Sequence, residues 1–268
     1  MNKKISVIQE TICACLAVLL FAHLPFGVTS VQAQQSQNRF NLVEKIQHFF
    51  FGTRSIGTPT GRQRGGAVRG RCSKLGNQII ALVPSTKERT PFVEQTINER
   101  PTFWFYVPYS EINAEFVMIN SQNKAFYATT FLLNKQPGII ELKLPQTIPP
   151  LQQSNEYRWV FSAICDPKNR ATDAIVNGTL KRIPINPELN NQLKTASAQE
   201  QVSLYTENKL WYETLTTLSE VQYNEPQNAQ IKADWANVLH LVGLPQDVPQ
   251  TTWATYSLSN SNENTRNH

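Results

Sequence analysis

The stretch from residue 77 to residue 182 constrains the fold most, because short apolar or alternating runs follow one another there with turn residues between them. In one of these runs Ile140 and Leu142 point to one side of an extended chain and Glu141 points to the other. The pattern predicts strands at 77–83, 101–108, 114–120, 124–133, 138–144, 156–165 and 173–182.

Strands of this number and spacing predict a mainly β domain over residues 72–185, in the form of an antiparallel β-sandwich of immunoglobulin-like size. Turn signals at 137–138 (Pro-Gly) and 166–167 (Asp-Pro) support the separation of the strands. With 40% hydrophobic residues, the chain has enough apolar side chains to bury a core of this size. A barrel with the same number of strands is the alternative, and periodicity does not distinguish the two.

The segment after the predicted strands carries apolar residues at helical spacing. Pro187 stands where the first helix begins, and Gly243 follows the last one. A small helical region at 186–245 therefore follows the β domain, and the polar residues 246–268 predict a disordered tail. The expected helices cover 187–205, 208–222 and 228–242.

The N-terminal 33 residues have the pattern of a secretory signal peptide. Lys3 and Lys4 precede an apolar stretch at 12–22, and Val31 and Ala33 are the small residues that signal peptidase requires before its cleavage site. An uncleaved membrane anchor is the alternative, but the apolar stretch is short for a membrane span. We therefore expect cleavage near Ala33 and a periplasmic or extracellular protein without a transmembrane helix.

Cleavage at this position leaves two cysteines, Cys72 and Cys165. In an oxidising compartment the simplest prediction is one disulfide bond between them. A cross-link over such a long loop stabilises the folded chain by about 4–5 kcal/mol in the chain-entropy model. Two free thiols are the alternative. Two cysteines alone cannot form a structural zinc site, and we expect no metal and no cofactor.

Residues 34–71 precede the β domain and contain two distinct parts. In 39–51, the apolar side chains Leu42, Ile46 and Phe50 lie on one face of a predicted amphipathic helix, with Phe49 beside them. This face suits either a membrane surface or the protein's own domain, and we favour the second.

The stretch 53–71 carries five arginines, no acidic residue and many Gly and Pro residues, so it predicts an irregular basic linker. Its candidate binding residues are Arg62, Arg64 and Arg69, since guanidinium groups bind phosphate and carboxylate groups of envelope polymers bidentately. A merely solvated linker is the simpler interpretation. Nucleic acid is not expected, because the compartment does not suit it and no aromatic residues interleave with the arginines.

The predicted strand 101–108 is rich in aromatic residues. If Phe103 and Phe105 face the core, Trp104 and Tyr106 lie on the outer face, with Tyr109 just beyond. A row of exposed aromatic rings stacks on sugars or anchors a protein partner. The alternative is that the helical region covers this face of the sheet and buries the three rings.

Several segments together resemble one known family. They are ERPTFWFYVPY (99–109), EFVMI (115–119), YATTFLL (127–133), PGIIELKLP (137–145), YRWVFSAICDPKNR (157–170), RGRC (69–72), ALVPSTKE (81–88), LWYETLTTLSEV (210–221) and DWANVLHLVGL (234–244). This set is similar to the cyanobacterial domain of unknown function 928 family. The resemblance implies an exported, envelope-associated protein and carries no catalytic residues with it.

Catalytic motifs give no support for an enzyme. The sequence has no H-E-x-x-H and no G-x-S-x-G segment. We therefore expect an exported, non-catalytic binding or scaffold protein of the cell envelope, with an envelope protein or an anionic envelope glycan as partner. A polysaccharide-binding module with exposed aromatic residues is one alternative, and a carbohydrate-active enzyme is another. The sequence does not indicate the oligomeric state.

Overall fold

The computed structural model describes residues 42–51, 58–59, 64–65, 72, 78–84, 91–133, 136–248 and 253–258. The chain divides into two compact units, residues 1–39 and 40–268, and all described residues belong to the second. The predicted signal peptide, Arg62 and Arg69 lie outside the described residues.

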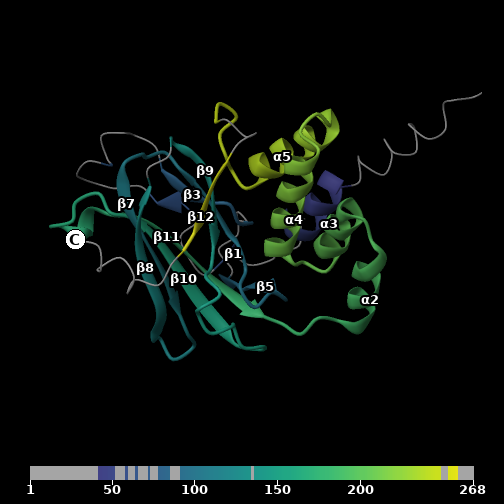
Figure 1. Ribbon diagram of the computed structural model, residues 1–268, viewed down its shortest axis with the longest axis horizontal. Coiled ribbons are helices and arrows are strands. Elements are labelled where there is room, and N and C mark those ends of the chain that lie inside the picture. Colours follow the sequence, from purple (N-terminus) through teal and green to yellow (C-terminus); the bar gives the residue numbers. More distant parts are fainter. Residues whose placement is uncertain are drawn as a thin grey trace, which may run out of the picture. The chain divides into compact units, whose positions relative to one another are not determined.

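Two five-stranded sheets form the centre of the second unit (Figure 1). Sheet 1 contains, in spatial order, β5 (Glu94–Thr96), β11 (Ala174–Arg182), β10 (Glu156–Ala163), β7 (Ile112–Ile119) and β8 (Ala125–Leu133). Sheet 2 contains β12 (Trp253–Ser257), β9 (Gly138–Lys143), β6 (Phe103–Val107), β3 (Ile79–Ala81) and β2 (Arg64–Gly65). A separate short pair joins β1 (Thr58–Pro59) to β4 (Pro91–Phe92).

The predicted mainly β architecture is confirmed, and each of the seven expected strands has a counterpart. The sheets are mixed, however, and not antiparallel as predicted. In sheet 1, β5 runs parallel to β11, and in sheet 2, β12 runs parallel to β9. Both parallel strands are short segments that the hydrophobic pattern did not indicate, and both lie at sheet edges, where one neighbour suffices.

Aromatic side chains fill the space between the two sheets. Phe105 of sheet 2 stacks on Phe161 of sheet 1 with ring centroids 4.3 Å apart, and Phe103 lies 4.9 Å from Phe116. Trp159 is fully buried beside them. It lies over Gly178 of β11, where a Cβ atom would come within 2.4 Å of the indole ring. The strand therefore requires a glycine at this position.

Four helices lie between β11 and β12 in the sequence and gather at one side of the sheets (Figure 1). The predicted helix 187–205 is in fact two, because Ser197 starts a new helix by forming a capping box with Glu200. The two helices that come next match their predictions closely. The helices are α2 (Pro187–Thr195), α3 (Ala198–Glu207), α4 (Trp211–Asn224) and α5 (Ala229–Leu241).

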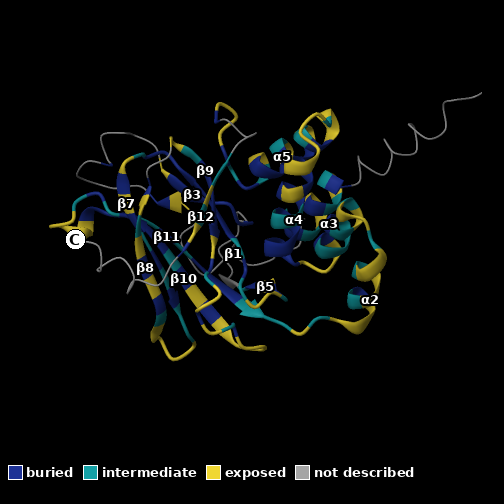
Figure 2. Cartoon of the chain, in the orientation of Figure 1, coloured by how far each residue is buried: buried dark blue, intermediate teal, exposed yellow. Residues whose placement is uncertain are grey.

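The N-terminal helix at residues 42–51 packs on its own domain, which confirms the interpretation that we favoured. Leu42, Ile46 and Phe50 are buried, and the ring of Phe50 meets the indole of Trp211 edge-on at 4.9 Å. Figure 2 shows the same alternation of buried and exposed positions on the helices that follow the strands.

A disulfide bond joins Cys72 to Cys165, as predicted, with the two Cα atoms 5.5 Å apart. Beyond Cys165 the chain turns through the 3-10 helix η2 (Arg170–Thr172). Asp173, at the end of this turn, accepts a hydrogen bond from the Cys165 amide at 3.2 Å and forms an ion pair with Arg170 at 2.5 Å. The polar loop therefore supports the cross-link.

The predicted disordered tail is wrong for residues 253–257, which form β12. Its side chains alternate: Tyr256 packs on Phe131 of sheet 1, while Trp253 points to the opposite side and contacts the helices. Within the described ranges, no helix is both long and apolar enough to cross a membrane.

Candidate functional site

The three aromatic residues predicted as a binding surface are covered. Trp104, Tyr106 and Tyr109 expose only 3%, 9% and 3% of their surfaces. The alternative interpretation holds instead, since the helical region packs on the outer face of sheet 2. The prediction that these rings stack on a ligand is therefore not supported by the fold.

Contacts to Trp104 show how the helices cover this face. Its indole nitrogen donates a hydrogen bond to the hydroxyl of Thr216 on α4 at 3.2 Å. Its ring meets Trp235 of α5 at 5.8 Å and Trp253 of β12 at 5.5 Å. Burial raises the pKa of Tyr106, and the negative charge of Asp247, just after α5, raises it further.

Arg64 belongs to β2 and is not part of an irregular linker, which corrects the prediction at this position. It stays exposed, and its guanidinium donates a 2.6 Å hydrogen bond to the carbonyl of Gly243 after α5. Gly243 has a φ of +86°, and a Cβ atom there would lie 2.4 Å from the guanidinium. Arg64 thus holds the end of α5 with one N–H group of its guanidinium. The other N–H groups can donate hydrogen bonds elsewhere.

At its N-terminal end, α4 carries a phenol and a carboxyl group that are sealed inside the protein. The hydroxyl of Tyr212 donates a short hydrogen bond to Glu94 of β5 and accepts one from the indole nitrogen of Trp159 at 3.1 Å. Glu94 is completely buried. Burial raises its pKa from 4.5 to about 8, and the bond from Tyr212 opposes this only in part.

The carboxylate of the neighbouring Glu213 is bound by the last residue of β5 and the two residues that follow it. One carboxylate oxygen accepts hydrogen bonds from the Thr96 hydroxyl at 2.6 Å and from the amides of Ile97 and Asn98 at 2.9 and 3.1 Å. Burial is the larger influence and raises the pKa of Glu213. Among the described residues, neither its second oxygen nor that of Glu94 has a hydrogen-bond partner.

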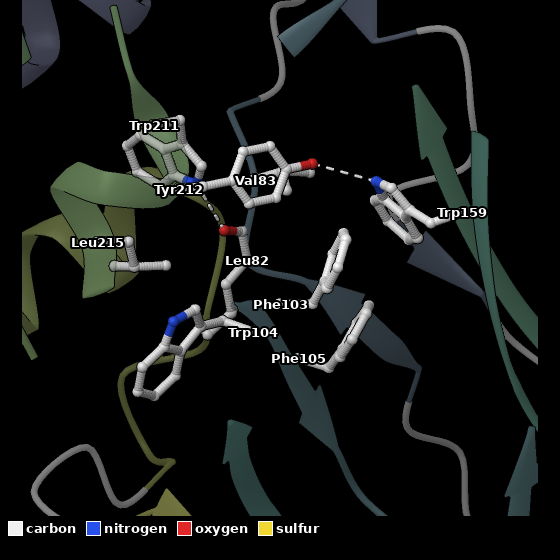
Figure 3. A pocket seen from close by; sticks show the side chains of 9 residues that line it. All are labelled: Leu82, Val83, Phe103, Trp104, Phe105, Trp159, Trp211, Tyr212 and Leu215. Atoms are coloured by element: carbon white, nitrogen blue, oxygen red, sulfur yellow. Dashed lines mark hydrogen bonds between the residues drawn. The ribbon is translucent and has the colours of Figure 1, made fainter. Parts of the chain in front are cut away.

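A cavity beside this cluster is too small for a substrate. Its volume is about 10 Å³, close to the room that one water molecule needs. Apolar and aromatic side chains line it, and two of them are held by hydrogen bonds: Trp211 to the carbonyl of Leu82, and Trp159 to Tyr212 (Figure 3). Neither Glu94 nor Glu213 is among the described residues that line it, and both carboxyl groups are buried.

Toward its C-terminal end, α4 carries a second carboxyl and phenol pair that is open to solvent. Thr216, Glu220 and Tyr223 follow one another at helical spacing, so they share a face of the helix. Tyr223 is 74% exposed, and its ring lies 6.3 Å from the half-buried ring of Trp253. Apart from Leu132, it is the one large hydrophobic side chain with this degree of exposure in the described ranges.

Polar groups of sheet 2 adjoin this end of α4. Glu141 of β9 accepts a hydrogen bond from the hydroxyl of Thr255 at 2.7 Å and pairs with the ammonium of Lys143 at 3.1 Å. Partial burial raises the pKa of Glu220; the charge of Lys143 lowers it in part, and the charge of Glu141 has a smaller, raising effect. The three charged groups therefore lie within electrostatic reach of one another. We call the set Glu141, Lys143, Glu220, Tyr223, Trp253 and Thr255 the α4–β9–β12 surface.

The α4–β9–β12 surface presents two aromatic rings, the exposed carboxylate of Glu220, one ammonium group and one hydroxyl on rigid elements, while the carboxylate of Glu141 is buried beneath them. Such a set suits a ligand with an apolar face and many hydroxyl groups, because the rings stack and the exposed carboxylate accepts hydrogen bonds. The described residues contain no group of three His, Cys, Asp or Glu side chains suited to a metal ion.

The family model for the Domain of Unknown Function (DUF928) matches residues 64–252, more than half of the 268-residue chain. The chain belongs to this family. A comparison with curated proteins gives no match. Four residues of the α4–β9–β12 surface lie within the DUF928 match, and Trp253 and Thr255 lie just beyond its end.

Sequence reasoning did not find the α4–β9–β12 surface. Its residues come from two strands and a helix, and their side chains meet only because β12 pairs with β9. One signal was present: Tyr223 is a large aromatic residue in a run of polar residues near the end of a predicted helix. An aromatic side chain in such surroundings is a candidate for exposure.

Proposed function

We propose that this DUF928 protein is an exported, non-catalytic component of the cell envelope that binds glycan through the α4–β9–β12 surface. The observation that carries the proposal is the exposure of Tyr223, at 74%, beside Trp253 and on the same face of α4 as the exposed carboxylate of Glu220. A disulfide in the domain that follows a signal-like N-terminus supports export, because disulfides persist in oxidising compartments.

The charges of the surface favour an uncharged sugar polymer. Glu141 and Glu220 outnumber Lys143, so the surface repels anionic groups more than it attracts them. Sugar hydroxyl groups donate hydrogen bonds to carboxylates, and the C–H face of a sugar ring packs on an aromatic ring. The charges of this surface therefore disfavour the anionic glycan that we expected from the sequence. Binding of an anionic glycan would depend on the arginines alone.

A binding role also agrees with where the unusual carboxyl groups lie. Glu94 and Glu213 have the raised pKa values that acid catalysts need, but both are buried beneath the helices. Their partners are side chains and amides of the fold itself. We therefore assign these two groups to the packing of α4 on the sheets, and the exposed pair to binding.

The test is retention of the exported protein on insoluble glycan. The full chain is expressed with export, and the product is incubated with purified sacculi freed of anionic polymers and with solubilised envelope proteins. Tyr223→Ala should weaken retention on sacculi about thirtyfold, since a central aromatic contact is worth at least about 2 kcal/mol. The part of retention that depends on Tyr223 should change little with salt, because stacking of a sugar ring on an aromatic ring involves no ion pair to screen.

Two matched variants separate sugar stacking from a protein contact. Tyr223→Phe keeps the ring and should keep binding, whereas Tyr223→Leu keeps only apolar area and should lose it. Unchanged retention of Tyr223→Ala on sacculi would sink the proposal. Retention on envelope proteins alone, with Tyr223→Leu still active, would instead make the protein a scaffold.

A further inference from the structure

The polar part of the α4–β9–β12 surface is organised around one buried carboxylate. Glu141 lies in a row of residues on the outer face of sheet 2, because its ladder partners are Trp104 on β6 and Thr255 on β12. Trp104 is covered by α4, whereas Thr255 is exposed. Glu141 itself exposes only 5% of its surface. It therefore lies at the boundary between the packed part of this face and the open part.

Each oxygen of this carboxylate holds one exposed group. Oε2 accepts the hydrogen bond from the hydroxyl of Thr255 at 2.7 Å, and Oε1 pairs with the ammonium of Lys143 at 3.1 Å. The side chain of Lys143 is 48% exposed. For stability alone, apolar residues serve as well as a buried charge, because the charge is costly to desolvate. A buried carboxylate whose two partners both reach solvent suits the orientation of those partners toward a ligand.

The hydrogen bond to Glu141 fixes the polarity of the Thr255 hydroxyl group. A hydroxyl group has one hydrogen, and a carboxylate paired with an ammonium group only accepts, so this hydrogen points to Glu141. A ligand at Thr255 must then supply the hydrogen. Lys143 has the opposite character, because the N–H groups that Glu141 does not use require an acceptor.

We propose that Glu141 is a positioning residue that makes the α4–β9–β12 surface specific for glycan units with a free hydroxyl group. A sugar hydroxyl can donate to Thr255 and accept from Lys143, on a glycan that stacks on Tyr223. An ether or ester oxygen accepts but does not donate. The inference rests on the proposed function and deepens it, because it names the chemical group that the surface recognises.

The test compares two forms of the same probe. Purified sacculi freed of anionic polymers are treated with acetic anhydride, which converts free hydroxyl groups to esters. Mild alkali then returns the esters of one half to hydroxyl groups, while acetylated amines survive in both halves. The exported full-chain protein should be retained about tenfold better on the hydroxyl form than on the ester form, as expected for the loss of one hydrogen bond.

Variants separate hydrogen bonding from the bulk of the acetyl group. Thr255→Val keeps the shape of the side chain without the acceptor, so the ratio of retention on the two forms should fall to near one, and Thr255→Ser should restore it. Glu141→Gln should lower the ratio too, because an amide can donate to Thr255 and turn the hydroxyl hydrogen toward the ligand. Thr130→Val, the same change at an exposed position of β8 in sheet 1, is the matched control and should keep the wild-type ratio.

The ratio is measured within each variant, so partial unfolding lowers retention on both forms alike. A ratio that persists in Thr255→Val would come from the bulk of the ester and would overturn the proposal, as would an unchanged ratio in Glu141→Gln. Equal retention of the wild type on both forms, still lost in Tyr223→Ala, would refute hydroxyl recognition and leave glycan binding intact. No retention on either form would refute the proposed function and this inference together.

Discussion

The two ends of α4 carry the same chemical groups in opposite surroundings. At the first turn, Tyr212 and Glu213 are buried, and each finds its hydrogen-bond partner on or next to β5. At the last turns, Glu220 and Tyr223 reach solvent beside β9 and β12. The difference teaches that a phenol and a carboxyl group indicate a role only together with their burial.

The buried end relies on complementarity between the helix and the strands. Trp159 donates to Tyr212 and Tyr212 donates to Glu94, which forms a chain of hydrogen bonds that links α4 to two strands of sheet 1, β10 and β5. At the exposed end, water can solvate each group, so removal of a side chain leaves nothing unsatisfied. Stability should therefore depend on the first end and binding on the second.

The largest expected effect concerns the ionisation of Glu94. Its pKa is about 8 in the folded protein and near 4.5 when unfolded, so the folded state binds the extra proton between these values. The free energy of unfolding should be highest below pH 4.5 as far as this group is concerned, and should fall as the pH rises to about 8. The fall is on the order of 5 kcal/mol.

Glu94→Gln checks this expectation, because the amide keeps an acceptor for Tyr212 and cannot ionise. Urea unfolding of both proteins from pH 4 to pH 9 should show a steep decline for the wild type and a much flatter profile for the variant. Parallel profiles would mean that Glu94 ionises elsewhere in the pH range. Glu220→Gln, at the exposed end, is the control; because partial burial also raises the pKa of Glu220, this variant should flatten the profile only slightly.

Trp211→Ala should destabilise the buried end by about 3–5 kcal/mol, as large aromatic deletions in cores do. The indole is 1% exposed, meets Phe50 edge-on and donates to the carbonyl of Leu82 at 2.9 Å. Tyr223→Ala at the other end should stay within about 0.5 kcal/mol. Chemical denaturation under oxidising conditions measures both, and equal losses would contradict the contrast between the two ends.

A smaller effect is expected for Tyr212→Phe, which removes one hydroxyl and little volume. The loss leaves the indole nitrogen of Trp159 and the carboxyl group of Glu94 without their shared partner. Such unsatisfied buried groups cost about 1–3 kcal/mol. Tyr223→Phe is the matched control with no expected loss. Equal stability of the two variants would show that the buried chain of hydrogen bonds contributes nothing net.

The elements of the fold were largely predictable because their signals are local. Alternation located the strands of both sheets, and spacing located the buried face of residues 42–51. The break between α2 and α3 also has a local signal, the S-x-x-E pattern of Ser197 and Glu200, which outweighs the continuous apolar spacing. Here the capping chemistry was present and the prediction passed over it.

Burial of Trp104 was also foreshadowed in the sequence. The strand FWFYV is apolar without interruption, and such runs are typical of strands with both faces covered. The sequence analysis left open whether the outer face of this strand is wet, as in an antiparallel sandwich, or covered by the helical region. A helical region that follows a sheet in sequence has to cover some apolar surface, and in this protein that surface is the outer side of β6.

The α4–β9–β12 surface was not predictable from the sequence for a different reason. Thr255 and Glu141 are 114 residues apart, and they meet because a short polar-looking strand pairs in parallel with β9. The alternation in the five residues WATYS is too brief to outweigh the polar composition of residues 246–268, which predicted a disordered tail. Parallel pairing at an edge depends on which strand of the sheet still has an unpaired side. The pattern of residues in a short segment does not contain that information.

The position of β12 has a consequence for the order in which the molecule is made. Sheet 2 contains β2 at residues 64–65 and β12 at residues 253–257, so it stays one strand short until the whole region matched by the family has been synthesised. Contacts of such long range close slowly. Under the export that we propose, a chain that folds late in this way stays unfolded during its passage through the membrane, and the edge of β9 is covered only afterwards.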